Sequence, residues 1–211
     1  MQIPLTQFAA GALVEDEVRF EAVNRQPIPC CRLRRGHFIR PDGILLILES
    51  PHKDEYIRQS FTPVGPLQKD DKFKRHLRSV LDAVRTSMGI AVPNGDIVFC
   101  NPVQYQASLA QLFPSRASIK KMPRDSMWNA LYARGSIQND FIRRVAQYRP
   151  RLVIEACSGK DEQGTIPGSP KEAVQGTLLD LRRFGILTCP IIAVGHPAWW
   201  NGRTFNHIYR I

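Results

Sequence analysis

Four short apolar runs mark the chain, and each is bounded by proline, glycine or charged residues. They predict strands over residues 44–49, 96–100, 152–156 and 190–195. Uninterrupted apolar runs of this length are typical of strands that are buried on both faces in a parallel sheet. The pattern therefore predicts a sheet at the centre of the fold.

Between these runs, apolar residues recur at helical spacing and predict helices over about 70–88, 137–148 and 170–184. The residues expected to face the core are Phe73, Leu77, Val80, Leu81 and Val84 in the first helix, Ile137, Phe141, Ile142 and Val145 in the second, and Val174, Leu178, Leu181 and Phe184 in the third. Alternating strands and helices predict an α/β fold, a three-layer α/β/α sandwich with a central, mainly parallel four-stranded sheet. The 211 residues suit a single domain over 1–211, with residues 1–43 as an N-terminal extension packed on it.

Short polar motifs follow three of the predicted strands. They are Glu49-Ser50-Pro51-His52, Asn101-Pro102-Val103-Gln104-Tyr105 and Gly195-His196-Pro197-Ala198-Trp199-Trp200. Ligands of open parallel sheets bind beyond the carboxyl ends of the strands. We therefore expect a carboxylate, a carboxamide and an imidazole to meet in one cleft.

The charge of the chain favours a polyanionic partner. Its 29 Lys and Arg residues outnumber 19 Asp and Glu, which gives a net charge of +10. Such an excess favours nucleic acid first and an acidic membrane second, although it can also serve solubility alone. No run reaches the about 18 apolar residues of a membrane span, and the N-terminus lacks signal-peptide features. We expect a cytoplasmic protein.

The chain lacks the common signatures of metal and cofactor sites. Its five cysteines form no C-x2-C pair, and neither G-x-G-x-x-G nor a Walker-type loop occurs. We expect no metal and no cofactor. One alternative stays open, since His52, Asp54 and Glu55 lie close together and would suit metal ligands in an unrelated α/β hydrolase.

The order of the motifs resembles the uracil-DNA glycosylase superfamily over roughly residues 44–203. Leu48-Glu49-Ser50-Pro51-His52 is similar to the Gly-Glu-Ala-Pro-Gly motif of the Glu-type branch, whose iron–sulfur cysteines this chain lacks. Asn101 matches an Asn at the end of the second strand, and His196-Pro197-Ala198-Trp199 matches a His-Pro-Ser-Pro-like loop. Phe61-Thr62-Pro63-Val64-Gly65-Pro66 looks like the Pro-Phe-Val-Gly-Pro loop of the same branch.

The resemblance implies a role for each of these motifs. Glu49 would activate the attacking water, His196 would donate a hydrogen bond to the departing base, and Asn101 would read that base. Phe61 would stack on the base, with Phe73 as the alternative. Pocket residues would also include His52, Tyr105, Ser50 and Pro51. Contacts to DNA would come from Trp199 or Trp200 as a wedge between bases, and from Arg203, Arg116, Lys120, Lys121 and Lys69.

These roles describe a monofunctional DNA glycosylase that flips a damaged or modified pyrimidine out of DNA and hydrolyses its N-glycosidic bond. Base-excision repair and defence against phage DNA with modified bases are both possible settings. Leu48 and His52 depart from the motif of the branch and leave the excised base open. We expect a monomer that binds double- or single-stranded DNA. The alternative is an inactive module of the same fold that binds altered DNA.

Overall fold

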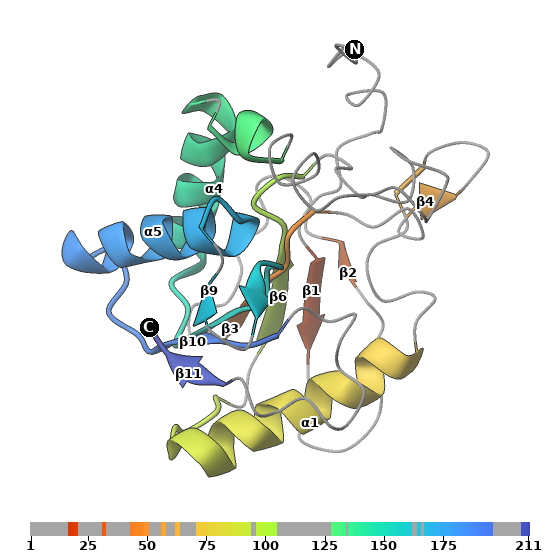
Figure 1. Cartoon of the computed structure of the whole chain (residues 1–211). Coiled ribbons are helices and arrows are strands. Elements are labelled where there is room, and N and C mark those ends of the chain that lie inside the picture. The colour runs from red at the N-terminus through yellow and green to blue at the C-terminus, as the bar shows by residue number, and fades with distance from the viewer. Residues whose placement is uncertain are drawn as a thin grey trace.

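The fold is seen in a computed structural model of the whole chain (Figure 1). The structure describes residues 43–50, 71–93, 96–104, 128–133, 135–161, 164–165, 167–195 and 208–211, together with the short strands at 17–20, 31–32, 56–57 and 62–63. The strands of the central sheet and the helices that pack on it lie within these ranges.

One seven-stranded sheet forms the centre of the molecule, in the order β11-β10-β7-β3-β6-β1-β2. Its four middle strands are parallel: β10 (Ile191–Ala193), β7 (Leu152–Glu155), β3 (Ile44–Ile47) and β6 (Asp96–Cys100). They are the four strands that the apolar runs predict. In register, Ile47 lies between Cys100 and Glu155, so the strands end almost level.

The predicted number of strands, four, was wrong. Antiparallel strands β1 (Glu17–Phe20) and β2 (Cys31–Arg32) extend the sheet beyond β6, and β11 (Tyr209–Arg210) extends it beyond β10. These three strands have two to four residues and include charged ones, so they carry no apolar run that would predict them. Two small antiparallel hairpins, β4 (Tyr56–Ile57) with β5 (Thr62–Pro63) and β8 (Lys160–Asp161) with β9 (Gly164–Thr165), lie between the predicted strands and helices.

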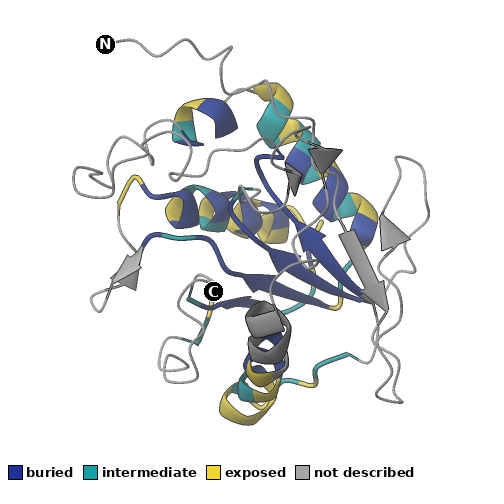
Figure 2. Ribbon diagram, turned by 90° about the vertical axis from the view of Figure 1, so that its right-hand side faces the viewer, coloured by how far each residue is buried: buried dark blue, intermediate teal, exposed yellow. Residues whose placement is uncertain are grey.

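Helices cover both faces of the sheet and confirm the three-layer α/β/α arrangement (Figures 1 and 2). Helix α1 (Asp71–Met88) packs on one face. Helices α4 (Gly135–Tyr148) and α5 (Pro170–Arg183) pack on the other, together with helical residues 128–132. The predicted inward residues that are buried are Leu77, Val80, Leu81, Val84, Phe141, Val145, Val174, Leu178 and Leu181.

Helix α5 shows how local sequence sets its limits. The Ser169 side chain accepts a hydrogen bond from Glu172 N at 3.3 Å, which caps the helix, and Pro170 occupies the first turn. The helix ends before Gly185, which has a φ of 70°. Glycine adopts this left-handed conformation without strain because it has no Cβ. The predicted burial of Phe184 was wrong, because this residue is the C-cap and is 74% exposed.

Candidate functional site

The parallel pairing continues beyond the strands and brings their carboxyl ends together at one edge of the sheet. Leu48 N donates to Cys100 O at 2.9 Å, Ala156 N to Ile47 O at 2.8 Å, and Val194 N to Glu155 O at 2.8 Å. The chain then leaves β3 at Glu49 and β6 at Asn101, side by side. This is the edge at which open α/β sheets bind ligands.

The structure describes three of the predicted site residues. Glu49 and Asn101 are 7% and 4% exposed, and Ser50 is half-buried. The predicted residues that lie outside the described part of the chain are His196, Phe61, His52, Tyr105, Pro51, Trp199, Trp200, Arg203, Arg116, Lys120, Lys121 and Lys69.

Ser158, which follows β7, holds the carboxylate of Glu49. Its backbone N–H donates to Glu49 Oε2 at 3.2 Å, and its hydroxyl donates to the same oxygen. From the described residues, Glu49 Oε1 receives no hydrogen bond. One carboxylate oxygen is therefore fixed, and the other can accept a proton or a hydrogen bond from a bound molecule.

A buried tryptophan fixes the backbone at the same point. Trp128, which is 0% exposed, donates from Nε1 to Glu49 O at 3.1 Å and stacks on Tyr132 with 4.8 Å between ring centroids. Burial raises the pKa of the Tyr132 hydroxyl, which donates to Thr177 Oγ1 at 2.8 Å. Ser158 thus holds the side chain of Glu49, and Trp128 holds its backbone carbonyl.

Arg144 of α4 holds the end of β6. Its guanidinium donates to Asn101 O and to Cys100 Sγ, both at 3.0 Å, and to Asp140 Oδ2 at 2.8 Å. Burial alone would raise the pKa of the Asp140 carboxyl, but the hydrogen bonds and charges of Arg143 and Arg144 outweigh it and hold that pKa below its ordinary value. Asp140 therefore stays charged and keeps Arg144 in place.

The amide oxygen of Asn101 is buried and has no hydrogen-bond partner among the described residues. A buried acceptor without a donor costs about 1–3 kcal/mol, so native proteins seldom keep one without a function. A ligand with an N–H or O–H group would satisfy it. The structure thus places an unpaired acceptor at the end of β6, the strand next to the one whose end carries Glu49.

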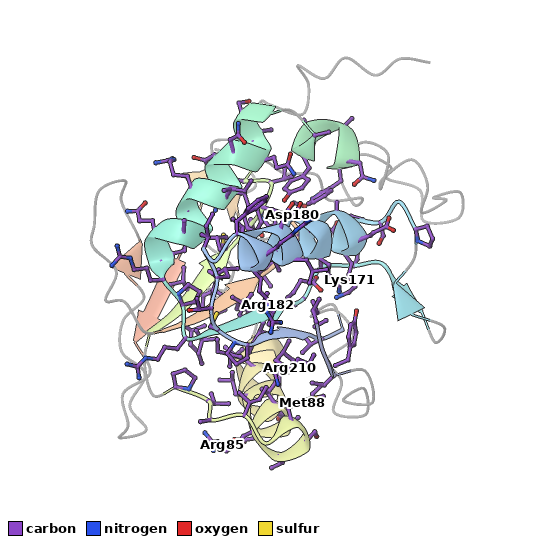
Figure 3. The ribbon with its side chains drawn as sticks, turned by 90° about the vertical axis from the view of Figure 1, so that its left-hand side faces the viewer. Arg85, Met88, Lys171, Asp180, Arg182 and Arg210 are labelled. Atoms are coloured by element: carbon purple, nitrogen blue, oxygen red, sulfur yellow. The ribbon has the colours of Figure 1, made fainter. Side chains whose placement is uncertain are left out.

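A fully buried ion pair lies under the same strand ends. Lys171 Nζ is 2.6 Å from Glu155 Oε2, and both side chains are 0% exposed. Lys171 extends from the side of α5 that faces the sheet (Figure 3). Burial, and next the charge of Glu155, raise the pKa of the neighbouring Cys157 thiol, which donates to Leu48 O at 3.1 Å.

Sequence reasoning missed Ser158, Trp128, Arg144 and the ion pair. Ser158 carried a usable signal, since it is a polar residue just after a predicted strand, as Glu49 and Asn101 are. Trp128 and Arg144 gave none, because their partners are far away in the chain.

One cavity in the described part of the chain lies away from this edge of the sheet. It has a volume of about 660 Å³ and opens at the amino ends of β7 and β10, where Arg149, Arg151 and Pro190 line it. No three His, Cys, Asp or Glu side chains gather as metal ligands in the described ranges, and His52, Asp54 and Glu55 lie outside them. No helix of that part of the chain is long and apolar enough to cross a membrane.

The chain was compared with protein-family models, with curated proteins and with solved structures, and no match was found.

Proposed function

We propose that this chain is a monofunctional DNA glycosylase, which flips a damaged or modified pyrimidine out of DNA and hydrolyses its N-glycosidic bond. The observation that carries the proposal is the juxtaposition at adjacent strand ends of a held carboxylate, Glu49, and an open buried acceptor, Asn101 Oδ1. Base-excision repair and defence against phage DNA are the settings that fit such an activity.

Asn101 reads the flipped base in this mechanism. Its Oδ1 accepts from a ring or exocyclic N–H of the base, and its Nδ2 donates to a base carbonyl oxygen. The backbone of Asn101 is already fixed by Arg144. Because the backbone of Asn101 is already ordered when the base arrives, binding costs little additional conformational entropy.

Glu49 orients the water that attacks the sugar. Ser158 holds Oε2, which leaves Oε1 for the water. The bond between C1′ and the base nitrogen breaks, and both of its electrons leave with the base. The water oxygen bonds to C1′, and its proton passes to Glu49 and then to the departed base. The reaction needs no metal or cofactor.

The other proposed roles fall on residues outside the described part of the chain. His196, two residues beyond the buried Val194, would donate to the carbonyl oxygen of the base, where negative charge develops. Phe61 would stack on the base, and Trp199 or Trp200 would enter the gap in the duplex. The net charge of +10 favours DNA as partner. We place the protein in the cytoplasm, as a monomer.

The test is a search for alkali-labile sites in DNAs that carry uracil, hypoxanthine, oxidised pyrimidines, 5-hydroxymethylcytosine or glucosylated bases. Wild-type protein should create such sites in at least one of them, whereas Glu49→Gln and Asn101→Ala should not. Asp180→Asn and Asn139→Ala are matched controls on exposed helix positions and should keep full activity. Tight, salt-dependent DNA binding without any product would instead favour the inactive binding module.

A further inference from the structure

We propose that the buried Glu155–Lys171 ion pair is a positioning element that fixes two strand ends of the candidate site relative to one another. The first end is the segment after β7 that holds Glu49, and the second is the end of β10 that leads to His196. The inference rests on the proposed function, because the reaction is what this geometry would serve.

The side chain of Glu155 holds the segment after β7, and the backbone of Lys171 holds it as well. Glu155 Oε1 accepts from Cys157 N at 2.6 Å, and Lys171 N donates to Ser158 O at 3.0 Å. Ser158 is the residue that bonds the carboxylate of Glu49. The position of the Glu49 carboxylate therefore depends on the Glu155 side chain through Cys157 and Ser158.

The same ammonium group also fixes β10. Lys171 Nζ donates to Val194 O at 3.0 Å, in addition to its contact with Glu155. Val194 is 2% exposed and is the second residue before His196. The buried ammonium group of Lys171 thus bonds the side chain of Glu155 on β7 and the backbone of Val194, which follows β10.

Further contacts hold the pair in one geometry. Gln175 Nε2, one turn along α5, donates to Glu155 Oε2 at 3.0 Å and to the Tyr209 hydroxyl at 2.8 Å. The network therefore spans β7, α5, the end of β10 and β11. A buried ion pair adds little stability compared with apolar residues of similar volume, so fixing one arrangement is the better explanation for it.

The test compares wild type with the double variant Glu155→Gln/Lys171→Met, which removes both charges and the bond to Val194 O. Val174→Ala is the control, because it shortens a fully buried side chain on the same helix without touching the network. Three quantities are measured for each protein: the single-turnover rate of base release, the Kd for DNA, and amide hydrogen exchange over residues 156–158 and 194–195.

The double variant should release base about 10- to 100-fold more slowly, as expected for a small misplacement of reacting groups, while its Kd for DNA stays within about twofold. Amides of the two strand ends should exchange faster than in the control. A rate equal to that of wild type, or lowered only as much as in Val174→Ala, would overturn the inference. If wild type itself releases no base, the proposed function fails separately, and exchange alone decides: unchanged protection at both strand ends refutes the positioning role.

Discussion

Removing Lys171 alone should destabilise the protein far more than removing the whole ion pair. In Lys171→Met, the carboxylate of Glu155 stays fully buried and loses the ammonium that lay 2.6 Å away. Breaking one partner of a buried pair typically costs about 3–5 kcal/mol. For a domain of this size, about 2–4 °C of melting temperature corresponds to 1 kcal/mol, so the melting temperature should fall by roughly 6–20 °C.

The double variant Glu155→Gln/Lys171→Met removes the unpaired charge but not every cost. Val194 O still loses its donor, and a buried carbonyl without one costs about 1–3 kcal/mol. The double variant should therefore be more stable than Lys171→Met by roughly 2 kcal/mol, since the two changes share one buried interaction.

Chemical denaturation of wild type, both single variants and the double variant measures this non-additivity directly. Circular dichroism before unfolding shows whether each variant starts from the same fold. If the double variant were less stable than Lys171→Met, the two side chains would not form the buried pair from which the argument starts.

Three further predictions concern the surroundings of the site. Ser158→Ala removes the hydroxyl hydrogen bond to Glu49, worth about 1.5 kcal/mol, and should slow base release roughly 10-fold. Ser158→Thr retains a hydroxyl and should keep the wild-type rate. Equal rates of base release in the two variants would refute the role of the Ser158 hydroxyl. Trp128→Phe should lower the free energy of unfolding by about 2–4 kcal/mol, which a urea titration would detect; a loss below about 1 kcal/mol would contradict the tight packing. The folded state holds the pKa of the Asp140 carboxyl below its ordinary value. As the pH falls, this carboxyl is therefore protonated in the unfolded chain before it is protonated in the folded one, and its contribution to the stability of the fold is lost below about pH 4. Asp140→Asn should therefore lose less stability than wild type in that range, and parallel melting curves in acid would contradict this.

The centre of the fold could be predicted from the sequence because its physical cause is local in the sequence. Four apolar runs become four adjacent parallel strands, and helical spacing predicts α1, α4 and α5. The antiparallel strands β1, β2 and β11 could not be predicted in this way. Each has only two to four residues and is held by pairing with the strands beside it, so its own residues need no apolar pattern.

The candidate site divides in the same way. The placement of Glu49 and Asn101 near neighbouring strand ends could be predicted, because each follows an apolar run that predicts a strand. Ser158 also follows a predicted strand, but its bond to Glu49, 109 residues away in the chain, could not be predicted. Trp128 lies 79 residues from Glu49 and follows no predicted strand, so nothing in the sequence pointed to it. The helix predicted over about 170–184 includes Lys171. Its periodic pattern does not show whether a lysine in it is buried against the sheet or exposed to water.

The most direct test of the central claim is mass spectrometry of the small molecules released when wild type or Glu49→Gln is incubated with DNA from the same panel. We predict that wild type releases a free base from at least one DNA and leaves the strand with an intact sugar at that position. Glu49→Gln should bind the same DNA and release nothing. Release of nucleotides, or equal release of base by Glu49→Gln, would contradict a glycosylase that acts through this carboxylate.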